Sequence, residues 1–368
     1  MKLTKKLAAL LLAAAAGLLG LSACTDDSGP DTPGTTTQPE KGFAADSVIG
    51  VSLPWLGTTN WAEASKLLDS ELAAAGFKPT VLQADQKIEV QQQQIESLIE
   101  AGAKVIVVGP EDGKSLGTVL EKAKAEGIFI LGYDRLLENT NAVDGVVQYG
   151  SVDTGREQAK ALLAGLAAWK GDGPYNIELF GGGPADPNAP NFFKGAMEIL
   201  QPKIDDGTLV VVSGQTTFQD CATEAWSADK AQERMDSLLA TFYSDKDIDG
   251  ALSPNDSIAR AIITAVQNSG NTDPFPTSGL DSDVLSIEWI AAGTQYSTVD
   301  KPAKDLVAKT LELIKILQSG KDLPAGTGTA KNGVIDVQLF ELPPVAVTKD
   351  NACTVFANDA ERFAAAQC

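Results

Sequence analysis

Short runs of apolar and β-branched residues alternate with helical stretches along most of this chain, and this alternation limits the fold more than any other feature. The first set of predicted strands lies at 48–53, 80–83, 104–108 and 128–132, with helices at 61–75, 89–101 and 114–126 between them. The strand at 104–108 is almost continuously apolar, as a strand covered on both faces requires. This pattern predicts a parallel sheet with right-handed helical crossovers.

The same pattern begins again after Gly150. Strands are predicted at 175–180, 209–213, 250–252 and 277–279, and helices near 191–200, 228–242 and 257–268. The stretch from residue 46 to the C-terminus is too long for one compact core. We therefore expect an α/β fold with two doubly wound, Rossmann-like lobes.

The N-terminal segment has the form of an export signal. Lysines precede an apolar run from Leu7 to Leu21, and small residues lead to Cys24. The run is shorter than the roughly 20 residues that span a bilayer, which argues against a transmembrane helix. Leu-Ser-Ala before Cys24 resembles a bacterial lipobox, so we expect residues 1–24 to be a lipoprotein signal peptide and Cys24 to be lipidated.

The segment after Cys24 fits a tether. Residues 25–45 are rich in Pro, Gly, Ser and Thr and lack apolar periodicity, so they are predicted to form a disordered linker. The protein is expected at the extracytoplasmic face of the cell membrane, anchored by lipid.

Charge and composition exclude several kinds of site. The net charge is −20 at pH 7, and loss of the signal would remove three lysines and no acid. Such a surface repels nucleic acid and anionic lipid. The chain has no histidine, which excludes Ser-His and Cys-His nucleophiles and His-ligated metals. We expect no metal and no cofactor.

Three cysteines follow Cys24: Cys221, Cys353 and Cys368. They lack the spacing of metal ligands, and an oxidising compartment favours one disulfide and one spare thiol. A Cys353–Cys368 bridge would fix the C-terminal tail, and a bridge from Cys221 to either of them is the alternative.

Polar and aromatic side chains follow the predicted strands, at the edge where open α/β sheets bind ligands. The segments concerned are 54–61, 133–135, 181–188, 253–256 and 280–281. They supply carboxylate acceptors, a guanidinium, amides and an indole ring. A polyol needs this mixture, because each hydroxyl both donates and accepts while the C–H faces of a sugar pack on aromatic rings.

Each of these residues also has a structural interpretation. Asp134, Asn255 and Asp256 have the residue types of turns and helix N-caps. Taken by itself, Trp61 is more typical of an apolar core than of a ligand contact. The argument for a site is that all five strand ends carry side chains suited to the same kind of ligand.

The stretch from residue 46 onward resembles the type I periplasmic sugar-binding proteins, in particular the multiple-monosaccharide receptors and the xylose-binding proteins. The matching segments occur in the same order over nearly the whole stretch. They are Tyr133-Asp134-Arg135, YNIELFGG at 175–182, Asp186-Pro187-Asn188-Ala189, VSGQ at 212–215, AQERMDSLL at 231–239, LSPND at 252–256, IAAGTQYST at 290–298 and PVAVTKDN at 344–351.

The resemblance implies a sugar-binding site between the lobes. By position it comprises Trp61, Asp134, Arg135, Asp186, Asn188, Trp226, Asn255, Asp256, Asp281 and Lys301. The two tryptophans match aromatics that sandwich the sugar ring. Asn60 and Leu280 depart from the family, which often has Arg and Gln there. Replacing Arg by Asn removes a bidentate donor, so the preferred sugar is left open.

The resemblance also implies the organisation and mechanism of the receptor. The N-terminal lobe would comprise 46–150 plus 283–322, and the C-terminal lobe 151–282 plus 323–368. A three-segment hinge near 150–153, 282–283 and 323 would close the lobes on the ligand. The expected partners are a monosaccharide and the permease and ATPase subunits of an ABC importer, with membrane contact only through the lipid. The protein would be a monomer and would not be an enzyme.

Two other functions are alternatives to this receptor. A secreted glycosidase would use Asp134, Asp256 or Asp281 as acid and base. A closed cleft leaves no exit for an aglycone, and Arg135 would keep Asp134 ionised. A receptor of the same fold that feeds a sensor is the other alternative.

Overall fold

A seven-stranded sheet forms the centre of the part that we call the first lobe. The computed structural model describes residues 42–368, so the predicted signal peptide, Cys24 and most of the predicted linker lie outside the described residues. The strand order is β10-β11-β5-β4-β3-β1-β2, in which only the β10–β11 pair is antiparallel. The strands are β1 (Val48–Leu53), β2 (Lys78–Gln83), β3 (Val105–Val108), β4 (Phe129–Tyr133), β5 (Gly145–Tyr149), β10 (Gly328–Lys331) and β11 (Asp336–Leu342).

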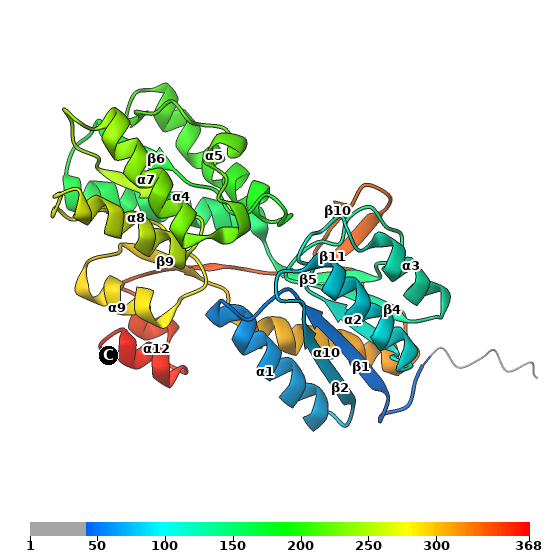
Figure 1. The fold of residues 1–368 in the computed structure, drawn as a ribbon. Helices are drawn as coiled ribbons and strands as arrows, with labels where there is room; N and C mark the ends of the chain where they lie inside the picture. The colour runs from blue at the N-terminus through cyan, green and yellow to red at the C-terminus, as the bar shows by residue number, and fades with distance from the viewer. Residues whose placement is uncertain (1–41) are drawn as a thin grey trace, which may run out of the picture. The chain divides into compact units, whose positions relative to one another are not determined.

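Helices cover both faces of this sheet (Figure 1). On one face, α1 (Thr59–Ala74) and α10 (Ala303–Gln318) pack on the alternate strand residues that include Val51 and Val107. On the other face, α2 (Ile88–Glu100) and α3 (Gly117–Ala125) pack on the strand residues that alternate with these, such as Ile106. This double burial explains why β3 is apolar throughout.

The second lobe contains the three-stranded parallel sheet β7-β6-β8. Its strands are β6 (Tyr175–Leu179), β7 (Leu209–Val211) and β8 (Gly250–Leu252). One face packs on α4 (Ser151–Lys170) and α5 (Ala189–Asp205), and the other on α7 (Ala228–Phe242) and α8 (Asp256–Asn268). The short helices α6 (Phe218–Cys221) and η1 (Glu224–Trp226) lie between β7 and α7. The segment predicted as a strand at 277–279 forms only an isolated bridge between Thr277 and Ala251.

A C-terminal subdomain completes the second lobe. It contains α9 (Val284–Ala292), the antiparallel pair β9 (Ser297–Asp300) and β12 (Val345–Thr348), α11 (Ala352–Val355) and α12 (Ala360–Ala365). Ile287 of α9, Val347 of β12 and Phe356 share one apolar cluster.

The lobe boundaries differ from the sequence prediction in two places. Residues 284–300, which were assigned to the N-terminal lobe, pack in the second lobe through α9 and β9. Residues 328–342, which were assigned to the C-terminal lobe, extend the first sheet, because β11 pairs with β5. This pairing joins segments that are almost two hundred residues apart, so no local sequence pattern indicates it.

The chain therefore crosses between the lobes at 149–151, 300–303 and 342–345. The first of these lies at the predicted hinge, whereas the hinges predicted near 282–283 and 323 lie inside the second and the first lobe respectively. The crossovers lie side by side: the Gly150 N–H donates to the Leu342 carbonyl at 3.1 Å, and the Tyr149 hydroxyl donates to the Pro302 carbonyl at 3.1 Å.

Of the two disulfide alternatives, the structure has the bridge between Cys353 and Cys368, and Cys221 is a buried free thiol.

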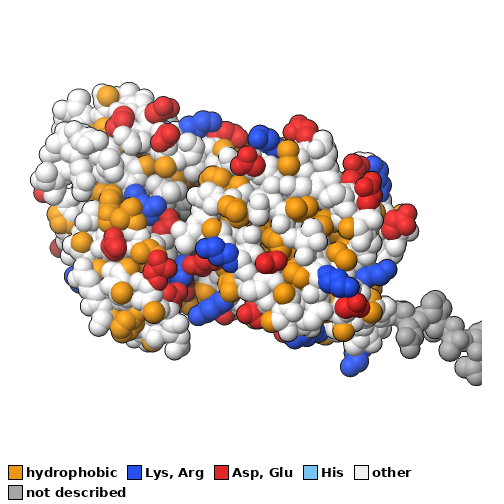
Figure 2. Space-filling view, turned by 60° about the horizontal axis from the view of Figure 1, so that its bottom comes forward, with side chains coloured by type: hydrophobic (Ala, Val, Ile, Leu, Met, Phe, Trp, Pro, Cys, Tyr) orange, Lys and Arg blue, Asp and Glu red, His pale blue; other side chains and the backbone are white. Residues whose placement is uncertain are grey.

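Within residues 42–368, no helix combines the length and the apolar character of a membrane span. On the face shown in Figure 2, acidic and basic side chains are interspersed.

Candidate functional site

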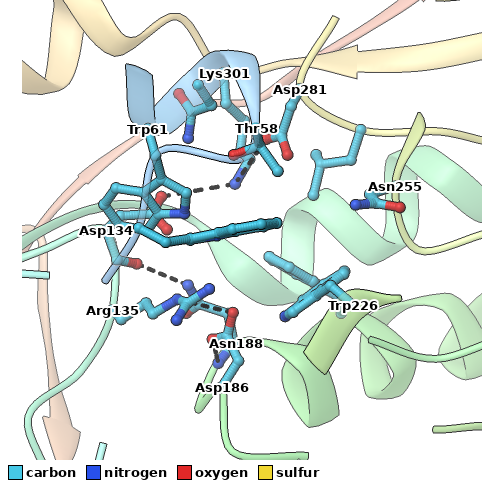
Figure 3. A pocket seen from close by; sticks show the side chains of 14 residues that line it. Thr58, Trp61, Asp134, Arg135, Asp186, Asn188, Trp226, Asn255, Asp281 and Lys301 are labelled. Carbon is cyan, nitrogen blue, oxygen red and sulfur yellow. Dashed lines mark hydrogen bonds and ion pairs between the residues drawn. The ribbon is translucent and has the colours of Figure 1, made fainter. Parts of the chain in front are cut away.

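A cavity lies between the two lobes, and side chains of both lobes and of the 300–303 crossover line it (Figure 3). The lining residues are Trp55, Thr58, Asn60, Trp61, Asp134, Arg135, Asp186, Asn188, Phe192, Trp226, Asn255, Leu280, Asp281 and Lys301. Nine of the ten residues that the sequence analysis predicted are among them. Their contact with a ligand stays a prediction.

The first lobe contributes the loop after β1 and the turn after β4. Trp61 lies in the first turn of α1 and is 4 % exposed, with its ring centroid 6.1 Å from that of Tyr133. The Arg135 guanidinium lies 5.3 Å from the centre of the Trp61 ring. Trp61 therefore belongs both to the core of this lobe and to the cavity wall.

Lys301 forms the electrostatic centre of the cavity. It lies on the crossover after β9, with its Nζ 3.7 Å from Asp134 Oδ1 and 3.6 Å from Asp281 Oδ1. Burial lowers the pKa of Lys301, but the carboxylates of Asp134, Asp281 and Asp186 outweigh this effect and leave the pKa raised. The site holds this lysine in its charged form.

The two carboxylates beside Lys301 occupy unusual backbone conformations. Asp134 has φ 63° and Asp281 has φ 84°, both in the left-handed region that non-glycine residues rarely adopt. Burial and the nearby charges of Asp134 and Asp283 raise the pKa of Asp281 to about 6, against the opposing effect of Lys301. Local strain of this kind gathers at functional sites, where the surrounding structure holds it in place.

A network of hydrogen bonds connects the lobes at the base of the cavity. Arg135 Nε of the first lobe lies 2.9 Å from Asp186 Oδ2 of the second, and Arg135 also donates to the Pro110 carbonyl at 3.0 Å. The Asn188 amide donates to the Asp134 carbonyl at 2.7 Å and accepts from the Ser151 hydroxyl at 2.8 Å. Burial raises the pKa of Asp186, which Arg135 partly counteracts.

Trp226 is the main aromatic group of the second lobe in the cavity. It follows Ala225 in η1, and both have left-handed φ values, of 54° and 55°. The indole packs on the backbone of Gly182 and Gly183: a Cβ on Gly182 would lie 2.2 Å from the ring. Gly182 and Gly183 therefore provide the space for this ring. Trp226 Nε1 is buried without a hydrogen-bond partner.

Asn255 and Asp256 differ in their roles, although the sequence analysis placed both in the site. Asn255 lines the cavity and also caps α8, because its side-chain oxygen accepts from the Ile258 N–H at 3.0 Å. Its amide nitrogen has no partner among the described residues, so this residue both caps a helix and lines the cavity.

Asp256 does not line this cavity, and its contact with a ligand stays a prediction. It is 1 % exposed and accepts hydrogen bonds from four donors, namely the backbone N–H groups of Leu280 and Asp283 and the side chains of Gln295 and Thr298. Burial, together with the nearby charge of Asp283, raises its pKa well above the usual value. Through these hydrogen bonds, Asp256 supports the turn that carries Asp281.

Five lining residues were not among the predicted site residues: Trp55, Thr58, Asn60, Phe192 and Leu280. Three of them lie in the 54–61 segment, and Leu280 directly precedes Asp281. Phe192 lies four residues after Asn188, which places both on one face of the start of α5. Its ring lies 6.4 Å from that of Trp226, and Lys301 Nζ lies 5.3 Å from its centre.

This arrangement favours the binding of a neutral polyol. Three carboxylates and two cations line the cavity, so the charged groups nearly balance. Trp226 Nε1 is buried without a hydrogen-bond partner, and the polar side chains of Thr58 and Asn60 line the same cavity. Unpaired buried polar groups are costly, and hydroxyl groups of a ligand would satisfy them. Among residues 42–368, no group of three or more acidic or thiol side chains is placed to hold a metal ion.

Comparison with known proteins gives three consistent results. Residues 49–322 match the family model described as periplasmic binding protein domain. The multiple sugar-binding periplasmic receptor ChvE of Rhizobium radiobacter is 38% identical over 316 residues, which cover 84% of this chain and 89% of the receptor. The D-xylose-binding periplasmic protein of Escherichia coli K12 is 32% identical over 303 residues, or 82% of this chain and 87% of that protein.

Solved structures agree with these relatives. An ABC transporter solute-binding protein from Clostridium phytofermentans with bound β-D-glucose has a TM-score of 0.81 at 30% identity, and the match covers 86% of this chain and 100% of that chain. A carbohydrate transporter solute-binding protein from Chloroflexus aurantiacus in complex with D-glucose has a TM-score of 0.78 at 29% identity, with 85% and 96% covered.

Proposed function

Because this chain belongs to the periplasmic binding protein domain family, we propose that it is the extracytoplasmic receptor of an ABC sugar importer and binds a monosaccharide in the cavity between its lobes. The observation that carries this proposal is the lining of the cavity. Charged groups, amides and three tryptophans line a space between the two lobes.

The proposed mechanism needs no covalent chemistry, and the protein is a binding receptor and not an enzyme. The lobes rotate about the three crossovers and bury the sugar. Hydroxyl groups then pair with Asp134, Asp281, Lys301 and Arg135 in a cavity with little water, where charge-assisted hydrogen bonds are strong. The glycosidase alternative loses one of its three carboxylates, because Asp256 lies outside the cavity.

Calorimetric titration of the full mature chain with D-glucose, D-xylose and D-galactose tests this function. We expect saturable one-to-one binding of at least one of them. A ligand at 100 times its Kd also raises the free energy of unfolding by about 2.7 kcal/mol, which a thermal-shift screen detects. No binding and no thermal shift with any pentose or hexose would contradict the proposal.

We also propose that the lipid on Cys24 holds the receptor at the extracytoplasmic face of the membrane, and that the chain acts as a monomer. The short apolar run before Cys24 and the polar residues after it support this anchoring. Cys24→Ser should prevent labelling by a palmitate analogue and release the protein into the medium. Full retention of this variant in the membrane fraction would contradict lipid anchoring.

A further inference from the structure

One ion pair connects the two lobes outside the cavity. Arg362 of α12, in the second lobe, donates from Nη2 to Glu63 Oε1 of α1, in the first lobe, at 2.9 Å. The two residues are 299 positions apart, and neither lines the cavity. The Arg362 side chain is 10 % exposed and that of Glu63 is 33 % exposed.

The same guanidinium also holds the turn that carries Asp281. Arg362 Nε donates to the Ser282 carbonyl at 2.9 Å. Ser282 has φ 52° and directly follows Asp281 with φ 84°, so two successive non-glycine residues have left-handed conformations. Such a turn persists only where its surroundings fix it. The Arg362 donor is one of these restraints, together with the hydrogen bonds of Asp256.

The position of Arg362 is fixed within the second lobe. Arg362 Nη1 donates to Asp359 Oδ2 at 2.7 Å, and Asp359 also caps α12. The disulfide between Cys353 and Cys368 closes the segment that contains Arg362 into a loop. On the other side, Glu63 lies in the first turns of α1, two residues after Trp61 of the cavity wall.

We propose that Arg362 is a positioning residue for sugar binding: its ion pair with Glu63 stabilises the closed arrangement of the lobes and links closure to the turn that presents Asp281. This inference rests on the proposed function. Rotation of the lobes about the crossovers separates α1 from α12, so the ion pair exists only when the lobes are closed. It therefore slows release of the ligand without touching it.

The chain offers a matched control in Glu198. This glutamate of α5 accepts from Arg156 Nη2 of α4 at 2.6 Å and is 38 % exposed. Both helices belong to the second lobe, so this ion pair does not change when the lobes move. Glu63→Ala and Glu198→Ala thus remove the same chemistry, and only the first removes a contact between the lobes.

Stopped-flow tryptophan fluorescence with D-glucose, D-xylose or D-galactose, whichever the wild type binds, measures the effect. We expect Glu63→Ala to raise the dissociation rate about three- to tenfold with little change in the association rate, as for one partly exposed charged pair. Glu198→Ala should match the wild type. In an Arg362→Met background, Glu63→Ala should have no further effect. Equal dissociation rates for Glu63→Ala and the wild type would overturn the proposal.

A second measurement separates this proposal from the proposed function. Spin labels on exposed helices of the two lobes report the distance between them in the sugar-free protein. Glu63→Ala should shift the distribution to longer distances relative to Glu198→Ala, whatever the ligand is. If the wild type binds no monosaccharide but this shift occurs, the function is wrong and the ion-pair proposal holds. Identical distributions would overturn the ion-pair proposal.

Discussion

The two lobes bring a tryptophan to the cavity in different ways. Trp61 of the first lobe is 4 % exposed and belongs to an apolar cluster that includes Val107, Tyr133 and Leu306. Trp226 of the second lobe is only partly buried and rests on the backbone of Gly182 and Gly183. The first lobe therefore uses a core residue as cavity wall, whereas the second adds a ring to its surface.

The charged groups show a similar contrast. In the first lobe, Arg135 contacts the Trp61 ring and the Pro110 carbonyl, so the core holds the cation in place. In the second, Asp281 lies on a strained turn that Asp256 and Arg362 hold from behind. We infer that changes in the first lobe affect folding and binding together, and that changes in the second affect mainly binding.

The largest expected effect tests this difference at the two tryptophans. Trp61→Ala should lower the free energy of unfolding of the sugar-free protein by about 3–5 kcal/mol, because it leaves a cavity in the core. Trp226→Ala should weaken sugar binding and change this free energy much less. Urea denaturation followed by circular dichroism measures both variants. Equal losses of stability would remove the contrast between the lobes.

The next effect concerns the first-lobe carboxylate. Asp134→Ala should reduce sugar affinity by about 2–4 kcal/mol, or roughly 30- to 1,000-fold, because buried charged groups lose their partner. Asp153→Ala is the control, since that carboxylate pairs with Arg156 away from the cavity. Calorimetry compares the two. If Asp134→Ala binds the sugar with wild-type affinity, the Asp134 carboxylate does not contact the sugar.

The pKa of about 6 at Asp281 gives the second lobe a dependence on pH. The ionised carboxylate accepts stronger hydrogen bonds from a sugar than the protonated acid does, so affinity should fall by up to about tenfold between pH 7 and pH 5. The free energy of unfolding should change with pH in the opposite direction. A carboxyl whose pKa is raised in the folded state favours folding when protonated, so Asp281 should contribute more stability at pH 5 than at pH 7.

Asp281→Asn is the control for both trends, because its side chain does not titrate. Its affinity and its free energy of unfolding should lack this component between pH 5 and pH 7. If the variant keeps the full pH dependence of the wild type, another group is responsible.

The smallest expected effect concerns the support of Trp226. Gly182→Ala adds a methyl group 2.2 Å from the indole, so the ring must move. Overpacking of this kind costs about 1–3 kcal/mol. We expect sugar affinity to fall about fivefold, with a spectral shift of tryptophan emission. Gly207→Ala, at a glycine with nothing within 4 Å, is a control for the added methyl group alone. Since Gly207 has φ 79°, this control should lose stability but not affinity.

Much of the site could be predicted from the sequence because strand ends and turn residues carry a local signal. Asp134, Arg135, Asn188 and Asn255 follow recognisable strands, and each lies in the cavity. Asp256 shares that local pattern, but its side chain points away into a set of four donors. Sequence does not reveal this direction, because Asp283, Gln295 and Thr298 reach it through the tertiary fold.

The lobe boundaries show the same limit at a larger scale. The strand pattern predicted two α/β units, but the return of β11 to the side of β5 depends on pairing between distant segments. Trp61 illustrates a third case. Core packing and ligand contact are alternative interpretations of this residue in the sequence, and the structure places it both in the core and in the cavity wall.

A crystal structure of the mature chain with a bound monosaccharide tests the central claim most directly. The account predicts one sugar ring between Trp61 and Trp226, with its hydroxyl groups hydrogen-bonded to Asp134, Arg135, Asp281 and Lys301 and with the lobes closed. A sugar bound elsewhere, or within the cavity without contact to the carboxylates of both lobes, would contradict it.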